Sequence, residues 1–123
     1  MTTILIVEDN LMVQEILAER LAMHGFETTV AGNGRQGIET AVRQKPDLIL
    51  MDMNLPDMDG WRATRELKGN RETAVIPIIA LTAYALPADR QKSEQAGCDA
   101  YETKPINFPH LLQTMAQLLT DKT

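Results

Sequence analysis

This sequence of 123 residues is poor in several features that mark particular protein classes. Its single cysteine, Cys98, cannot form an internal disulfide, which excludes the small secreted domains that depend on disulfides for stability. No segment approaches the roughly 20 apolar residues of a membrane-spanning helix. The opening segment MTTILIVEDN has no basic residue and only a short apolar run, so we predict neither a signal peptide nor a membrane anchor. We therefore expect a cytoplasmic protein with no membrane partner.

Basic residues are outnumbered by acidic ones. The 12 Lys and Arg residues stand against 17 Asp and Glu, which gives a net charge of -5. An acidic chain repels nucleic-acid phosphates, so we expect no direct nucleic-acid partner. The sequence also lacks low-complexity tracts, charge runs and linkers, and its length suits one domain with a real core. We predict a single domain over residues 1–123.

What the sequence does contain is a strict alternation of apolar runs and amphipathic segments. In the first amphipathic segment Leu11, Ile16, Leu21 and Met23 lie near helical spacing, and Gly25 follows as a stop signal. The apolar runs predict strands at residues 4–7, 27–31, 48–51, 76–82 and 99–103. The amphipathic segments predict helices at residues 11–25, 34–45, 60–70, 86–97 and 107–119.

Five strand–helix pairs in alternation predict an α/β protein with a parallel sheet and helices on both faces. Right-handed crossovers restrict the topology to a doubly wound fold. For five strands, the flavodoxin-like order 2-1-3-4-5 fits best. Ligands of such sheets bind beyond the carboxyl ends of the strands, so the residues that end each run are the candidates for function.

Reactive side chains lie at the ends of four runs. Glu8 and Asp9 follow the first run, Asp52 follows the third, Thr82 ends the fourth and Lys104 follows the fifth. In the predicted strand order these four strands are neighbours, so their terminal groups converge on one edge of the sheet. Close carboxylates repel one another, and a hard cation with oxygen ligands, such as Mg²⁺, relieves this repulsion. The Lys104 ammonium suits a phosphate group.

The segment PDLILMDMNLPDMDGW, residues 46–61, places Asp52 directly after a fully apolar run. A carboxylate can act as a nucleophile and form an aspartyl phosphate. Phosphoryl transfer requires mainly positioning, a metal ion and charge stabilisation, and the clustered residues supply all three. Taken singly, each residue has an ordinary interpretation: an acid as a helix N-cap, a threonine as a strand residue, a lysine as solvated surface. Their coincidence at one end of four different strands favours chemistry.

The residues around Asp52 have expected structural roles. Pro56 stiffens the loop, and Gly60 lets the next helix begin close to the strand end. Asp57 and Asp59 are expected to be loop and cap residues rather than metal ligands. Trp61, the only tryptophan, is expected to pack in the core near the site.

These motifs resemble the receiver domain of the two-component response regulators. The resemblance covers essentially the whole chain, in the family's order. The matching segments are VEDN with Glu8 and Asp9, LILMDMNLPDMDG with Asp52 and Gly60, ALTA with Thr82 and Ala83, and YETKP with Tyr101, Lys104 and Pro105.

The resemblance implies that Asp52 accepts a phosphoryl group from a phosphohistidine of a sensor kinase or a histidine phosphotransfer protein. It implies that Mg²⁺ is held by Asp9, by Asp52 and by the backbone carbonyl of Asn54, with Glu8 acting through water. The chain would then be a phosphorylation-dependent switch. It would be no enzyme in the usual sense, because it would catalyse only its own phosphorylation and dephosphorylation.

Further roles follow from the same resemblance. Lys104 and Thr82 would contact the phosphoryl oxygens, together with backbone amides near Asn54 and Ala83. Thr82 and Tyr101 would move together as a switch that acts on a downstream protein effector. The signalling surface would be the fourth helix, fifth strand and fifth helix, at about residues 86–119.

The resemblance also bears on the peptide bond before Pro105 and on three positions near the site that vary in the family. In the family the peptide bond before Pro105 is usually cis. Met53, Asn54 and Tyr84 occupy positions that vary in the family and tune the lifetime of the phosphoryl group.

Three other functions compete with this interpretation. Metal-dependent phosphohydrolases also form aspartyl phosphates, but they usually have a second Asp two residues later as acid–base, and Asn54 cannot transfer a proton. An inert scaffold is disfavoured because Asp52 and Lys104 are both present. A nucleotide-binding flavodoxin-like domain is disfavoured by the absence of a glycine-rich phosphate loop. A stand-alone regulator and a piece of a larger regulator or hybrid kinase both remain open, and the opening segment favours a stand-alone chain or an N-terminal receiver.

Overall fold

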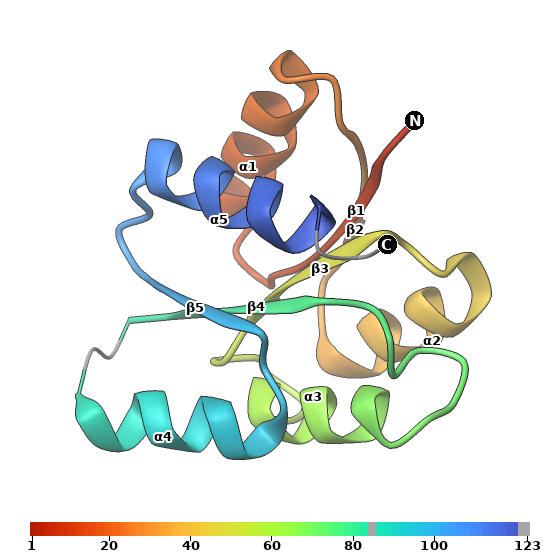
Figure 1. Ribbon diagram of the computed structural model, residues 1–123, viewed down its shortest axis with the longest axis vertical. Helices are drawn as coiled ribbons and strands as arrows, with labels where there is room; N and C mark the ends of the chain where they lie inside the picture. The colour runs from red at the N-terminus through yellow and green to blue at the C-terminus, as the bar shows by residue number, and fades with distance from the viewer. Residues whose placement is uncertain (84–85, 121–123) are drawn as a thin grey trace.

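The computed structural model describes residues 1–83 and 86–120, which form five strands alternating with five helices (Figure 1). The strands make one sheet in the order β2-β1-β3-β4-β5, and every neighbouring pair is parallel. The predicted α/β fold and strand order are therefore confirmed. The elements are β1 (Thr3–Val7), α1 (Leu11–Met23), β2 (Glu27–Ala31), α2 (Gly34–Gln44), β3 (Leu48–Asp52), α3 (Gly60–Lys68), β4 (Ile78–Thr82), α4 (Pro87–Ala96), β5 (Ala100–Thr103) and α5 (Phe108–Thr120).

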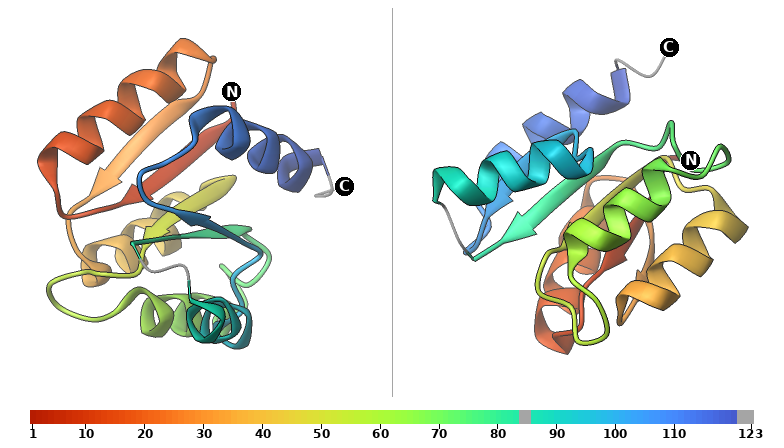
Figure 2. Two further views of the ribbon diagram at one scale, coloured as in Figure 1. Left: turned by 90° about the vertical axis from the view of Figure 1, so that its left-hand side faces the viewer. Right: turned by 90° about the horizontal axis from the view of Figure 1, so that it is seen from below.

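The helices form two layers, one on each face of the sheet (Figures 1 and 2). Helices α1 and α5 cover one face, while α2, α3 and α4 lie on the other, in front of the sheet in the right-hand view of Figure 2. Successive strand side chains point to opposite faces, so Ile4 and Ile6 pack with α1 and α5. Leu5 and Val7 pack with the other three helices. Both faces are buried, which explains why the inner strands read as continuous apolar runs.

The predicted apolar face of α1 was wrong in part. Leu17 and Leu21 are buried against the sheet, but Leu11, Ile16 and Met23 are 73%, 50% and 79% exposed. Ile16 lies five positions from both Leu11 and Leu21, which is about 140° around a helix of 3.6 residues per turn. A helix that packs on one sheet face buries only the narrow stripe that includes Leu17 and Leu21. Val13 and Ala18 pack partly against the same cluster, whereas Leu11, Ile16 and Met23 face outward.

The fourth strand begins later than predicted, at Ile78 instead of residue 76. Pro77 has no N–H to donate to the neighbouring strand, which places it before the ladder rather than within it. Its carbonyl still accepts a hydrogen bond from the Ile49 N–H at 3.0 Å. Ile76 nevertheless packs in the core.

The loop between β3 and α3 is fixed by close packing. The Gly60 N–H donates to the Met53 carbonyl at 3.0 Å. A Cβ on Gly60 would collide with the carbonyl oxygen of Asp52 and would lie 2.7 Å from the Met53 Cα. The expectation that Gly60 allows α3 to begin close to the strand end is therefore confirmed.

The two acidic residues of this loop are helix caps, and Trp61 at the start of α3 is buried, as expected. The Asp59 carboxylate caps α3 by accepting from the Arg62 N–H at 2.7 Å. The Asp57 carboxylate caps α2 by accepting from the Gly34 and Arg35 N–H groups. Trp61 is 9% exposed, and its indole N–H donates to the Ser93 hydroxyl at 3.0 Å.

Among the helices within residues 1–83 and 86–120, none combines the length and the apolar character that a bilayer span requires.

Candidate functional site

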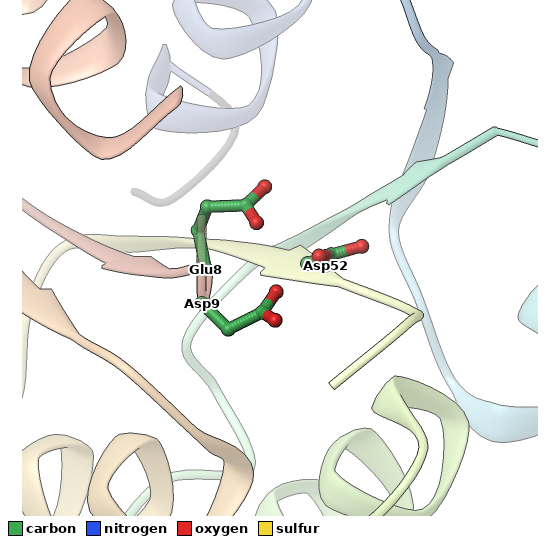
Figure 3. Close-up of side chains that lie close together, drawn as sticks. All are labelled: Glu8, Asp9 and Asp52. Atoms are coloured by element: carbon green, nitrogen blue, oxygen red, sulfur yellow. The ribbon is translucent and has the colours of Figure 1, made fainter. Parts of the chain in front are cut away.

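The predicted site residues meet at the carboxyl edge of the sheet. Glu8 and Asp9 follow β1, Asp52 is the last residue of β3, Thr82 is the last residue of β4, and Lys104 follows β5. Figure 3 shows the three acidic side chains together at the ends of β1 and β3. Their carboxylate oxygens lie within 4.8 Å of one another. The strand order thus brings together residues that are widely separated in the sequence.

Glu8 is a buried carboxylate held by several partners. Its backbone N–H extends the β1–β2 ladder by donating to the Ala31 carbonyl at 3.0 Å. Its carboxylate accepts from the Asn10 N–H at 3.1 Å and from the Lys104 ammonium at 2.9 Å. Only 1% of the Glu8 side chain is exposed. The partnership with Lys104, 96 positions away, was not anticipated from the sequence.

Two residues that support Glu8 were also missed. Asn10 is the N-cap of α1, because its side chain accepts from the Val13 N–H at 3.1 Å. Gln14, in the first turns of α1, donates from its side-chain amide to the Glu8 carbonyl. An Asn immediately before a helix is a recognised N-cap signal, so the N-cap role of Asn10 could have been predicted from the sequence. The bond from Gln14 depends on the three-dimensional approach of α1 to the strand end.

Asp52 is also buried, with 2% of the residue exposed. One carboxylate oxygen, Oδ1, accepts from the Asn54 N–H at 3.0 Å and lies 3.3 Å from the Lys104 ammonium. The strand ladder continues past it, since the Met53 N–H donates to the Leu81 carbonyl at 2.9 Å. Pairing with Leu81 in β4 and the contacts of its carboxylate with Asn54 and Lys104 therefore hold Asp52 in place.

Asp9 differs from the other two acids because it is exposed. Within the described residues its carboxylate has neither a hydrogen bond nor an ion pair. Glu8 and Asp52, by contrast, share the Lys104 ammonium. Asp9 is therefore the acid whose charge is least compensated by the protein.

The position of Lys104 is fixed by a backbone hydrogen bond as well as by its ion pairs with Glu8 and Asp52. Its N–H donates to the Thr82 carbonyl at 2.8 Å, and the bond between Lys104 and Pro105 is cis, as the family resemblance implies. Burial alone lowers the pKa of Lys104, but the hydrogen bond to Glu8 and the charges of Asp52 and Glu8 outweigh it, so the pKa is raised above its ordinary value. The side chain is therefore a cation at neutral pH.

The remaining predicted residues lie near this edge. Thr82 is buried, with 2% exposed, and the adjacent Ala83 is exposed. Tyr101 is half-buried in β5, opposite Ala80, and the Arg90 guanidinium lies 5.8 Å from the centre of its ring. Tyr84 lies outside the described residues.

The donor set fits a hard divalent cation. Three carboxylates and one ammonium leave an excess of two negative charges when all are ionised, which a divalent ion balances. Oxygen ligands of this kind, with room left for water beside the exposed Asp9, are typical of Mg²⁺ sites.

Asp9→Asn is expected to stabilise the protein in the absence of metal, because it removes the least compensated of three neighbouring negative charges. The gain is expected to reach up to about 1 kcal/mol, the upper range for exposed charge pairs. Mg²⁺ should stabilise the parent, by about 2.7 kcal/mol at 100 times its dissociation constant, and the variant much less. Urea melts with and without Mg²⁺ measure both effects. A variant that is weaker than the parent without metal would contradict this account of the site.

Known proteins are similar to this chain in sequence. The sequence model for the response regulator receiver domain matches residues 4–116. The polar-differentiation response regulator DivK of Brucella anthropi is 38% identical over 119 residues, which cover 97% of each chain. DivK of Brucella ovis is 37% identical over the same length.

Solved structures of response regulators and receiver domains are also similar to this chain. The receiver domain of a sensor histidine kinase from Pseudomonas aeruginosa is 39% identical, with a TM-score of 0.90 over 97% of this chain and 98% of the other. That structure has a magnesium ion coordinated in its active-site cleft. A response regulator from Chloroflexus aurantiacus superimposes with a TM-score of 0.92 at 28% identity, over 97% of this chain and 98% of the other.

Proposed function

This chain belongs to the response regulator receiver domain family of two-component signalling, and we propose that residues 1–123 form one receiver domain that accepts a phosphoryl group on Asp52. The observation that carries the proposal is the cluster of Glu8, Asp9, Asp52 and Lys104 at one edge of the sheet. Receiver domains are typically signalling proteins rather than enzymes. We propose that this one catalyses only its own phosphorylation and dephosphorylation.

The donor in this proposal is a phosphohistidine of a sensor kinase or a histidine phosphotransfer protein. A carboxylate oxygen of Asp52 attacks the phosphorus atom, the phosphorus–nitrogen bond breaks, and the electron pair leaves with the imidazole nitrogen. The rigid end of β3 orients Asp52 for this attack. Uptake of one phosphoryl group from acetyl phosphate by the parent, but not by Asp52→Asn, tests the proposal.

In this proposal the other residues of the cluster bind the metal ion and stabilise the charge of the phosphoryl group. Asp9, Asp52 and the backbone carbonyl of Asn54 would hold Mg²⁺, with Glu8 acting through water. Bound Mg²⁺ supplies positive charge that stabilises the phosphoryl oxygens during transfer. The Lys104 ammonium, already beside Asp52, adds a second positive charge, because its raised pKa keeps it protonated.

The proposed output depends on Thr82 and Tyr101. Phosphorylation brings new acceptor oxygens beside Thr82, and the backbone amides of Asn54 and Ala83 would assist in binding them. A ligand shifts a conformational equilibrium only through contacts that differ between the two states, and the bond to Thr82 is such a contact. An inward movement of Thr82 would leave space into which the Tyr101 ring could turn.

The proposed signalling surface is formed by α4, β5 and α5. A groove of about 670 Å³ runs between these elements, and its lining includes Arg90, Tyr101 and His110. Within the groove a ring nitrogen of His110 lies 2.7 Å from the Glu102 carboxylate. A downstream protein effector would bind here. We propose a cytoplasmic location and no direct nucleic-acid or membrane partner, as expected for a receiver domain with a net charge of -5.

Thr82→Ala is expected to leave phosphorylation of Asp52 largely intact and to remove most of the response of the α4-β5-α5 surface. NMR spectra with and without beryllofluoride, a phosphoryl mimic, measure the response. Thr28→Ala, on the edge strand β2, is the matched control and should respond like the parent. Shifts confined to α1 and α2 in the parent, with Tyr101 unchanged, would contradict the proposed output.

A further inference from the structure

The segment from Met53 to Asp59, between β3 and α3, carries the backbone of Asn54 and is tied to a helix distant in sequence. The Asp57 carboxylate accepts from the Gly34 N–H at 2.8 Å and from the Arg35 N–H at 2.9 Å. These are the first N–H groups of α2, which have no partner within the helix. Burial raises the pKa of Asp57, but backbone N–H donors, first those of Arg35 and Gly34, together outweigh it and lower the pKa, so the carboxylate is ionised at neutral pH.

The tie is more than a helix cap, because α2 already has one. The Asn33 side chain accepts from the Gln36 N–H at 2.9 Å and is the local N-cap. Asp57 adds bonds from 22 and 23 positions away. Met58 strengthens the same contact, since a Cβ on Gly34 would lie 3.0 Å from the Met58 sulfur. The loop and the start of α2 are therefore packed together without space between them.

Helix α2 also packs tightly against β1, the strand that Glu8 and Asp9 follow. A Cβ on Gly37 would lie only 2.8 Å from a methyl carbon of Val7, so the helix backbone packs directly on that side chain. Val7 is the residue immediately before Glu8 and Asp9. A continuous set of contacts thus runs from the end of β1, through α2, to the loop that holds Asn54.

We infer that Asp57 is a positioning residue that fixes the backbone carbonyl of Asn54 relative to Asp9 by clamping the β3–α3 loop to α2. The inference rests on the proposed role of Asn54 in holding Mg²⁺. Asp57 does not touch the metal in this account. It restricts the loop, so that the carbonyl is already in place when the cation arrives.

The test is Mg²⁺ affinity without any phosphodonor. The dissociation constant is measured at constant ionic strength from the fluorescence of Trp61, and independently from the shift of the urea midpoint with Mg²⁺ concentration. Asp57→Ala is expected to weaken binding about tenfold, at the lower end of the loss seen when groups supporting metal ligands are removed. Asp57→Asn has the same net charge as Asp57→Ala but keeps one acceptor oxygen. It should therefore recover a large part of the affinity.

Asn33→Ala is the control that separates positioning from helix stability. Asn33→Ala removes the local cap of α2 and should lower stability by about 1 kcal/mol, the usual loss for an N-cap, while Mg²⁺ binds as in the parent. If Asp57→Ala does not fold, Asp57→Gln replaces it. Glutamine has the charge and amide of asparagine, but its reach is longer by one methylene, so it should bind Mg²⁺ more weakly than Asp57→Asn.

If Asp57→Asn binds Mg²⁺ no more tightly than Asp57→Ala, or than Asp57→Gln where that variant replaces it, the inference is overturned. The loss of charge alone would then explain the loss of affinity. An equal loss in Asn33→Ala would also overturn it, since helix integrity would be responsible. If the parent binds Mg²⁺, Asp9→Asn abolishes binding and the Asp57 variants match the parent, the inference fails and the proposed function stands. If the parent shows no Mg²⁺ binding by either method, the proposed function fails and the inference falls with it.

Discussion

Asp52→Asn is expected to take up no phosphoryl group under conditions in which the parent takes up one. The parent's carboxylate oxygen is the nucleophile, and an amide oxygen is too weak to replace it. The substitution keeps the shape of the side chain, and the amide oxygen can still accept from the Asn54 N–H, so the fold should be retained. Intact-mass spectra after incubation with acetyl phosphate and Mg²⁺ measure the difference directly.

The control for this experiment comes from the same loop. Asp59→Asn makes the same acid-to-amide change, and asparagine is as good an N-cap as aspartate, so α3 should be unaffected. It should be phosphorylated like the parent, and a chelator should suppress the reaction in both. Phosphorylation of Asp52→Asn to the same extent as the parent would remove Asp52 from its proposed role.

Gly60→Ala is expected to destabilise the protein by about 3 kcal/mol, at the upper end of the range for overpacking. The added methyl group would meet the Asp52 carbonyl oxygen and the Met53 Cα, which are backbone atoms rather than flexible side chains. That backbone cannot retreat easily, because the Met53 N–H is bonded to Leu81 in the neighbouring strand. The strand end that carries the nucleophile must therefore shift, and phosphorylation should fall as well.

Urea melts of Gly60→Ala measure this loss against Gly32→Ala as the control. A Cβ on Gly32 would meet only the Gln36 side-chain oxygen, at 3.7 Å, which is ordinary contact distance. The control should therefore stay within about 0.5 kcal/mol of the parent, as surface substitutions usually do. Equal stability of the two variants would show that the close approach at Gly60 is not a constraint.

The arrangement of the site could be predicted because it follows from topology alone. Once the runs are assigned to parallel strands in a known order, the residues at their ends must meet at one edge of the sheet. Asp52 and Thr82 end strands, and Lys104 follows one, so their proximity required no knowledge of side-chain packing. The roles of Gly60 and Asp59 were predictable for a similar reason, since both depend on backbone geometry next to a helix start.

The partners within the site could not be predicted in the same way. The ion pair of Lys104 with Glu8, and not only with Asp52, depends on where a long side chain finds room between two strands. Asp57 was recognised as a cap residue, but the sequence does not say that it caps α2 instead of the adjacent α3. The apolar residues of α1 were overcounted because a list of apolar residues does not define which stripe faces the sheet.

Reductive trapping of the phosphorylated protein tests the central claim most directly. Borohydride reduces an aspartyl phosphate to homoserine, and peptide mass spectrometry then locates the reduced residue. After treatment with acetyl phosphate and Mg²⁺, the account predicts homoserine at position 52 alone, and none when Mg²⁺ is removed. Trapping at another carboxylate, such as Asp9 or Asp57, or a phosphoryl group that resists reduction because it lies on a hydroxyl side chain, would contradict the account.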